Sequence, residues 1–169
     1  MRCYGAPAEG NEQYSGNPNR SQNSLKIWST WMKYIISRTF KFEAAHRLLK
    51  NYTGKCTSNH GHSWLIKLHL EGDNLDEKDM LIDFQELKIL KTWIDENLDH
   101  ASLLWEMDPM CQYIKESGQR IYVTKKNPTS EHIAEVVLHE AIRLFENSRI
   151  KVQCVEVNET CTTGAKIIS

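Results

Sequence analysis

The sequence of 169 residues lacks a strong charge of either sign, because 21 basic and 22 acidic side chains leave a formal net charge of −1. No field of one sign therefore indicates nucleic acid or an anionic membrane surface as a partner. The chain also lacks any apolar run approaching the roughly 18 residues that span a bilayer, and its N-terminus lacks the apolar core of a secretory signal. Composition thus favours a cytoplasmic protein with neither a membrane nor a nucleic-acid partner.

The sequence also lacks an even, closely spaced set of cysteines. Its five cysteines are scattered at positions 3, 56, 111, 154 and 161, which favours reduced thiols over a disulfide framework. The length corresponds to about one domain on the usual scale of roughly 100–200 residues. Apolar residues at 40% and charged residues at 25% are ordinary for a globular protein.

Residues 1–31 contain few aliphatic side chains and are rich in Gly, Asn, Ser, Gln and Pro. Such a segment buries too little apolar surface to offset the entropy lost on ordering it. We therefore expect residues 1–31 to be a disordered or spurious N-terminal extension and residues 32–169 to form the folded domain. Trp28 and Trp31 leave room for the end of the extension to dock on that domain.

Four segments alternate apolar and polar side chains, the pattern of half-buried strands; they are residues 33–46, 60–71, 150–159 and 163–168. Two helical patterns lie between the second and third of these segments. The first is expected to begin at Asp83, an N-cap with Glu86 three residues on as in a capping box. The second opens at residues 127–130. Residues 105–126 are irregular, with a short strand expected at residues 121–124.

The order of elements is therefore two strands, two helices and two strands. Strands joined by short turns pair in antiparallel fashion, and both helices then cover one face of the sheet. We predict an α+β fold with a four-stranded antiparallel sheet and two helices on one face.

Three histidines are placed to converge. His60 and His62 are two apart on a strand and so project from the same face, while His46 ends the preceding strand with the parity of its apolar residues. A hairpin of the two strands would bring the three imidazoles together. Three histidines without an obvious fourth ligand are typical of a catalytic zinc site with an open position. The alternative for each histidine is a hydrogen-bonded, half-buried residue.

Other candidate residues have two or more interpretations each. Cys56 lies in the loop between the two histidine-bearing strands. It is interpreted as a fourth metal ligand, as a reactive thiol or as an inert loop cysteine. Asp99 beside His100 can set the tautomer of the imidazole, although sequence neighbours often diverge. Glu159 continues the apolar face of a strand and suits the adjacent N–H donors of an aminopyrimidine, unless it is an ordinary solvated charge.

Six sequence blocks together resemble the 6-pyruvoyltetrahydropterin synthase / 6-carboxytetrahydropterin synthase family. They appear in the order characteristic of that family and span about residues 37–168. The blocks are FEAAHRL (42–48), KCTSNHGHSW (55–64), IDFQELK (82–88), LDH (98–100), NPTSEHIA (127–134) and VNETCTTG (157–164).

The resemblance implies a tunnelling fold, in which the unit assembles into a trimeric barrel and two trimers stack into a homohexamer. It further implies that His46, His60 and His62 bind Zn²⁺.

The resemblance also implies roles at the substrate. Cys56 would be the catalytic thiol and would work with Asp99 and His100 in proton transfer. The pterin ring would be anchored by Glu159, helped by a neighbouring subunit's loop. The residues of that loop are Thr129 and Ser130.

The spacing of three residues between Cys56 and the His-Gly-His run resembles the bacterial, queuosine-pathway branch of the family. That branch converts 7,8-dihydroneopterin triphosphate to 6-carboxy-5,6,7,8-tetrahydropterin, with release of acetaldehyde and triphosphate. One alternative is 6-pyruvoyltetrahydropterin synthase chemistry, without carbon–carbon cleavage. Another is a zinc-binding module without catalysis, closed by Cys56. Leu104, where the family often has Asn, and the long segment 105–126 depart from the family pattern at the rim of the pocket.

Overall fold

The structure is a computed structural model that describes residues 32–169; the expected extension, residues 1–31 with Trp28 and Trp31, lies outside the described residues. The elements in chain order are β1 (Tyr34–His46), the 3₁₀ turn η1 (Lys55–Thr57), β2 (His60–Gly72), α2 (Lys88–Asn97), β3 (Ala101–Trp105), α3 (Met110–Glu116), β4 (Ile121–Thr124), α4 (Ser130–Phe145), β5 (Lys151–Asn158) and β6 (Gly164–Ile168).

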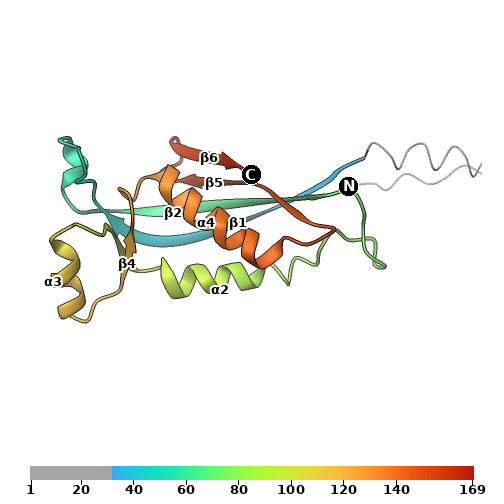
Figure 1. The fold of residues 1–169 in the computed structure, drawn as a ribbon, viewed down its shortest axis with the longest axis horizontal. Coiled ribbons are helices and arrows are strands. Elements are labelled where there is room, and N and C mark those ends of the chain that lie inside the picture. Colours follow the sequence, from blue (N-terminus) through green and yellow to red (C-terminus); the bar gives the residue numbers. More distant parts are fainter. Residues whose placement is uncertain (1–31) are drawn as a thin grey trace, which may run out of the picture. The chain divides into compact units, whose positions relative to one another are not determined.

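The sheet has six strands in the order β4-β3-β1-β2-β5-β6 (Figure 1). Its antiparallel part, β1-β2-β5-β6, is the predicted four-stranded sheet. The β1–β2 hairpin pairs His46 with His60 and Ala44 with His62. This register places the predicted histidines at the same end of two adjacent strands.

The prediction of only four strands was wrong, because β3 and β4 extend the sheet beyond β1 in parallel fashion. β4 coincides with the short strand expected at residues 121–124. β3 has the sequence ASLLW, a short apolar run directly after a helix. Strands that pair in parallel and are buried on both faces show continuous apolar runs without alternation, so periodicity did not identify β3.

The segment 105–126, expected to be irregular, also contains α3. This helix has only seven residues, too few to show a helical period, and its first free N–H, that of Met110, donates to Asp108 Oδ1 at 2.8 Å. Leu104, Cys111 and Ile114 form a small separate apolar cluster beneath it. The segment is therefore folded through its own cluster and through the sheet.

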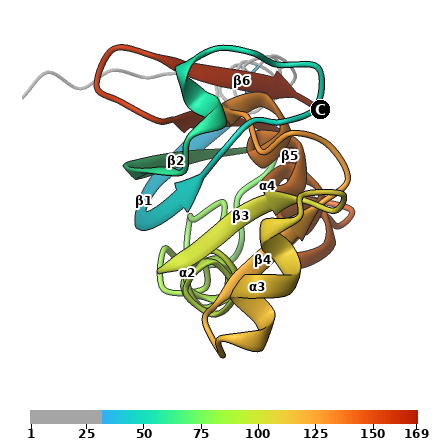
Figure 2. The ribbon, with the colours of Figure 1, turned by 90° about the vertical axis from the view of Figure 1, so that its left-hand side faces the viewer.

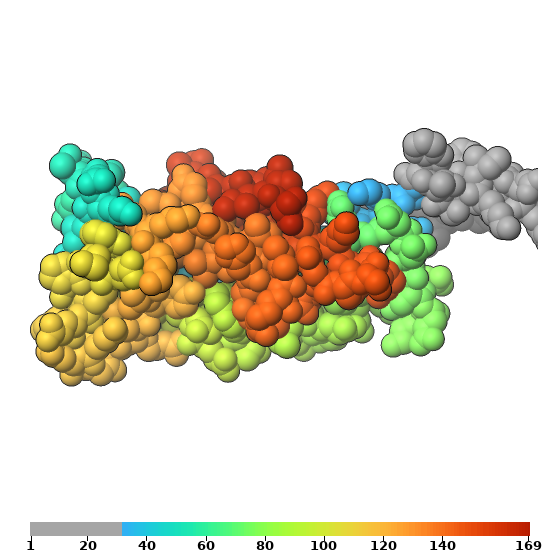
Figure 3. Space-filling view, viewed as in Figure 1, coloured from blue at the N-terminus to red at the C-terminus, as the bar shows by residue number. Residues whose placement is uncertain are grey.

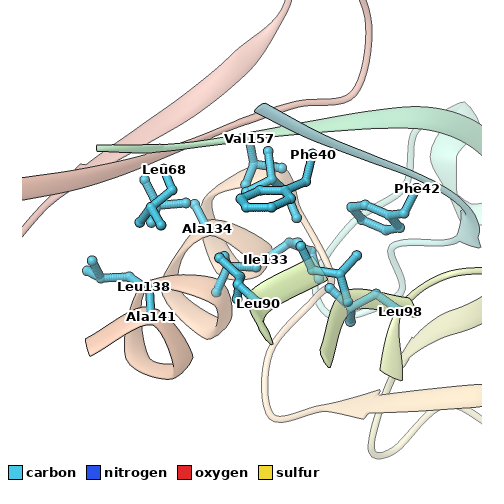
Figure 4. Close-up of a cluster of buried hydrophobic side chains, with 14 of the residues drawn as sticks. Phe40, Phe42, Leu68, Leu90, Leu98, Ile133, Ala134, Leu138, Ala141 and Val157 are labelled. Carbon is cyan, nitrogen blue, oxygen red and sulfur yellow. The ribbon is translucent and has the colours of Figure 1, made fainter. Parts of the chain in front are cut away.

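The helices α2 and α4 lie side by side on one face of the antiparallel strands, as predicted (Figures 1 and 2). The core lies between them and the sheet, where Phe40 and Leu68 face Leu90 and Ile133 (Figure 4). Removing such side chains from water is the main favourable contribution to folding. The face of the sheet away from α2 and α4 carries the polar members of each alternating strand.

The first helix begins later than predicted. Asp83 Oδ1 accepts from Gln85 N at 2.7 Å and its carbonyl accepts from Glu86 N at 3.0 Å, so Asp83 organises a turn and α2 starts at Lys88. Phe84, which lies in this turn, is 53% exposed. Its carbonyl accepts from Arg38, which holds this turn against β1. In contrast, α4 opens within residues 127–130 as predicted, and Thr129 is its N-cap.

Candidate active site

His46, His60 and His62 converge at one end of the β1–β2 hairpin. The centroid of the His46 ring lies 4.5 Å from that of His60 and 5.0 Å from that of His62, and the ligand atoms of all three lie within 4.8 Å of one another. Trp64 packs against His46 and His62 edge to face. Trp64 is fully buried, so the cluster has an apolar wall on its core side.

Backbone carbonyl groups set the tautomers of two of these rings. Nδ1 of His46 donates to the carbonyl of Pro128 at 2.7 Å, and Nδ1 of His60 donates to the carbonyl of Ser58 at 2.8 Å. A neutral imidazole that donates from one nitrogen carries a lone pair on the other. The Nε2 atoms of His46 and His60 lie 3.0 Å apart, so two lone pairs face each other there.

The third ring strengthens the case for a cation. Nε2 of His62 is buried and has no hydrogen-bond partner among the described residues. An unpaired polar atom in the interior costs free energy, and a metal ion bound by the Nε2 atoms would remove both this cost and the lone-pair repulsion. Metal-binding histidines commonly donate their other ring N–H to a carbonyl group. The three residues therefore fit a metal ion of the kind that imidazole nitrogen binds.

The electrostatics of His46 point in the same direction. The ring is 1% exposed, and this burial lowers the pKa of His46, while the bond to Pro128 and the charge of Glu159 act in the opposite sense. The neutral form, which is the form that binds metal, is thus the favoured one. Glu159 itself follows β5 and is half-buried.

The loop before α4 contains Pro128, whose carbonyl group contacts His46. The sequence did not predict the side-chain hydrogen bonds by which Asn127 holds this loop in place. Asn127 Oδ1 accepts from the N–H groups of Leu49 and Lys50 at 3.1 and 2.9 Å, and its Nδ2 donates to the carbonyl of Lys50 at 2.9 Å. Asn127 thereby ties the loop to the chain just beyond His46. The position of Asn127 in the NPTSEHIA block could have identified it as a candidate site residue. The backbone carbonyl groups of Pro128 and Ser58 could not be identified in this way, because a side-chain pattern carries no information about them.

The two residues expected to contact substrate from this loop, Thr129 and Ser130, follow Pro128 directly. Thr129 is the N-cap of α4 and accepts from His132 N, and Ser130 is buried at the first turn. The carbonyl that accepts from His46 belongs to Pro128, the residue directly before Thr129.

Asp99 and His100 form a pair, as one interpretation of the sequence required. His100 Nδ1 lies 2.8 Å from Asp99 Oδ2, and Asp99 Oδ1 accepts from Glu43 N at 2.8 Å. His100 has a φ of 56°, a left-handed conformation uncommon for residues other than glycine. Burial alone would raise the pKa of Asp99, but the bonds from Glu43 N and His100 lower it overall. The carboxylate is thus held in its ionised form beside the imidazole.

His62 and His100 line the same open groove, which has a volume of about 640 Å³. The groove runs over the ends of β1, β2 and β3 and is also lined by Glu43, Ser63 and Arg120. Of the three clustered histidines only His62 belongs to the lining of this groove, and of the Asp99–His100 pair only His100 does.

Cys56 lies apart from these groups. It is half-buried in η1, where its carbonyl accepts from Leu48 N at 2.8 Å. The neighbouring Cys56 thiol raises the pKa of Tyr52. Within residues 32–169, Cys56 is not one of the ligand atoms that gather with the three histidines. It also has no hydrogen bond with Asp99 or His100 there.

Solved structures with this arrangement of strands and helices define the class of protein. A crystal structure of an uncharacterized protein from Wolinella succinogenes superimposes with a TM-score of 0.73 and 25% identity, over 81% of this chain and 98% of the other. The 6-pyruvoyl tetrahydropterin synthase of Caenorhabditis elegans superimposes with a TM-score of 0.61 and 23% identity, over 82% and 96%. The fold is thus the α+β fold of the pterin synthases.

The family model described as 6-pyruvoyl tetrahydropterin synthase matches residues 35–168, and the chain belongs to this family. A relative from Rickettsia bellii, named 6-carboxy-5,6,7,8-tetrahydropterin synthase, is 36% identical over 73% of this chain and 92% of its own. Relatives of the same name from Aquifex aeolicus and Synechocystis are 30% and 33% identical, each over 80% of this chain. The predicted family is confirmed.

Proposed function

We propose that this chain is a zinc-dependent 6-carboxy-5,6,7,8-tetrahydropterin synthase, a lyase. Its substrate would be 7,8-dihydroneopterin triphosphate, and the products 6-carboxy-5,6,7,8-tetrahydropterin, acetaldehyde and triphosphate, in queuosine biosynthesis. The observation that carries the proposal is the cluster of three histidines whose ligand atoms lie close enough together to bind one metal ion. A relative that bears this name is 36% identical to the chain.

His46, His60 and His62 are the residues that would hold the zinc ion. When bound, zinc supplies Lewis-acid chemistry, polarising a substrate oxygen. The protein contributes the neutral tautomers that Pro128 and Ser58 impose. Three protein ligands leave a coordination position open, as catalytic zinc sites require.

Proton transfer is assigned to two separate groups. The Cys56 thiol would take a proton from the side chain of the substrate, and His100, oriented by Asp99, would return a proton elsewhere. Cys56 has no hydrogen bond with the Asp99–His100 pair within residues 32–169, and we propose that a second copy brings the two groups together. The assembly that the family resemblance implies is a homohexamer built as a dimer of trimers, and we propose that it acts in the cytoplasm.

Recognition of the pterin ring is assigned to Glu159. A carboxylate accepts two N–H donors side by side, as the aminopyrimidine edge of a pterin presents them. Thr129 and Ser130 would add hydroxyl groups at the ring from a neighbouring subunit. The charge of Glu159 acts to raise the pKa of His46, so this carboxylate lies within electrostatic range of the histidine cluster.

The test incubates the zinc-loaded protein with 7,8-dihydroneopterin triphosphate and follows three products by mass spectrometry and an acetaldehyde assay. We expect 6-carboxy-5,6,7,8-tetrahydropterin, acetaldehyde and triphosphate in equal amounts. Triphosphate with the 6-pyruvoyl product and no acetaldehyde would instead establish the synthase without carbon–carbon cleavage.

A Cys56→Ala variant separates enzyme from binding module. Removing a proton-transfer group costs about 10²–10⁴ in rate, so turnover should fall to that extent while zinc content stays unchanged. Cys111→Ser is the matched control, since Cys111 lies in the apolar cluster at α3 and its bond to the Trp105 carbonyl is retained by a hydroxyl. Loss of zinc together with the Cys56 thiol would support the non-catalytic module.

A further inference from the structure

A second group of metal-binding side chains lies on the face of the sheet away from α2 and α4. His69 on β2 and Cys154 on β5 are paired across the two strands, at the point where the register shifts, and Glu156 follows on β5. His69 lies between Leu68 and Leu70, both buried in the core, so its side chain points to the opposite face. None of the three residues belongs to a sequence block that resembles the pterin synthases.

The ligand atoms of this group lie close enough together to bind one ion. One ligand atom from each of the three side chains lies within 4.8 Å of the other two. Nε2 of His69 is 2.9 Å from Glu156 Oε1, yet this buried nitrogen has no hydrogen bond within the described chain. The two atoms are close without the alignment that a shared proton requires.

The chemistry of the three side chains selects a class of ion. Imidazole and thiolate are preferred by zinc and related late transition metals, and a carboxylate completes many such sites. Calcium and magnesium prefer oxygen ligands alone. Cys154 is 1% exposed as a residue and Glu156 is partly exposed, so an ion would be covered by the sheet on one side and reachable from the other.

One residue competes with a cation here. Lys166 on β6 lies with Nζ 3.2 Å from Glu156 Oε1, and its side chain is 49% exposed. An ion pair of such exposure is worth little. The ammonium group of Lys166 can therefore move into solvent when a divalent ion binds. The doubly charged ion would then lie beside the Glu156 carboxylate and attract it more strongly than the single charge of Lys166 does.

We propose that His69, Cys154 and Glu156 form a second metal site, for a divalent late transition metal such as zinc, distinct from the three-histidine cluster. The site stands on its own residues and does not depend on the proposed synthase activity. It holds the metal between β2 and β5, on the face of the sheet opposite the core.

Metal content and Co²⁺ spectroscopy of the full chain test the proposal. After zinc loading and desalting, elemental analysis should give two zinc ions per chain for the unchanged protein and one for Cys154→Ser or Glu156→Gln. His62→Ala should also give one, now at the second site. Loading with Co²⁺ should produce a thiolate-to-metal charge-transfer band that Cys154→Ser abolishes and Cys56→Ser retains.

Three outcomes would overturn the site. These are a single zinc ion in the unchanged protein that is lost in His62→Ala, a Co²⁺–thiolate band that survives in Cys154→Ser, or a band that disappears in Cys56→Ser. Circular dichroism of each variant tests whether it is folded. If Cys154→Ser does not fold, the zinc content of Glu156→Gln provides the test instead. Lys166→Met should tighten Co²⁺ binding at the second site by roughly twofold to fivefold, because the competing ammonium group is removed.

Discussion

At the scale of single residues, two carbonyl groups decide what the histidine cluster can do. By accepting from the Nδ1 atoms of His46 and His60, the carbonyl groups of Pro128 and Ser58 turn both Nε2 lone pairs toward one point. Without a metal ion, the Nε2 lone pairs of His46 and His60 repel each other, and the buried Nε2 of His62 has no hydrogen-bond partner among the described residues. Both features cost free energy. Binding a metal removes these costs, which couples metal affinity to the stability of the fold.

The Asn127 side chain offers a sharp test of this coupling. Asn127→Ala removes the three hydrogen bonds that hold the loop bearing Pro128 against the chain beyond His46. Loss of groups that orient metal ligands typically costs 10–100-fold in affinity, so we expect zinc affinity to fall by about tenfold. Competition against a chromophoric chelator measures the change.

Asn147→Ala is the control for this experiment. Asn147 also accepts from two backbone N–H groups, those of Arg149 and Ile150, but in a turn at β5 that has no bond to the histidines. Its replacement should lower stability without changing zinc affinity. Equal losses of affinity in both variants would show that Asn127 acts only through general stability.

At the scale of elements, an ion pair fastens the β3–α3–β4 segment to the end of β1. Arg47 donates to both carboxylate oxygens of Asp108, from Nε at 2.7 Å and from Nη2, and Met110 N donates to the same carboxylate. The side chain of Asp108 is 1% exposed and that of Arg47 is 21% exposed. Because Arg47 follows His46, this pair links the added segment to the strand that carries a proposed ligand.

Asp108→Asn should therefore destabilise the protein. Removing one partner of a buried ion pair costs about 3–5 kcal/mol, and the partial exposure of Arg47 reduces the expected loss to about 2–4 kcal/mol. Urea unfolding followed by circular dichroism measures it. Glu106→Gln, which breaks the exposed pair with Lys125, should change stability by no more than about 1 kcal/mol. Similar effects for the two variants would contradict a structural role for Asp108.

The same pair gives a pH dependence with a defined sign. Burial acts to raise the pKa of Asp108, but the bonds from Arg47 and Met110 N lower it overall. A carboxyl group whose pKa is lowered by folding adds stability above its unfolded pKa of about 3.9, and this stability is lost as the pH falls through the lowered value. The difference in unfolding free energy between the unchanged protein and Asp108→Asn should thus be full at pH 7 and shrink below about pH 4. A constant difference would exclude this linkage.

At the scale of the whole molecule, the proposed catalytic groups are distributed rather than gathered. Cys56 lies in η1, at the same end of the domain as α3 in Figures 1 and 2, and the surface there is formed by both segments in Figure 3. The Asp99–His100 pair instead opens into the groove beside β3. Under the proposed function, Cys56 of one chain would act together with the Asp99–His100 pair of another.

Co-expression of two inactive variants tests this division. Cys56→Ala and His100→Ala chains, mixed at random in one assembly, should regain about a quarter of the unchanged activity, because one interface in four joins the two intact residues. Steady-state turnover of the purified mixed assembly, carrying a different tag on each variant, measures the recovery. Activity equal to the sum of the two separate variants would place the complete site within one chain.

The local patterns of the sequence determined the alternating strands, the opening of α4 within residues 127–130 and the common face of His60 and His62, because periodicity and helix start signals depend on neighbours a few residues apart. Only the tertiary structure decided what depends on distant partners. It added β3 and α3 to the fold, moved the start of α2 from Asp83 to Lys88, and set the imidazole tautomers through carbonyl groups. It also brought His69 to Cys154 across two strands. Contacts between segments far apart in the chain follow from packing and register, which no short window of sequence contains.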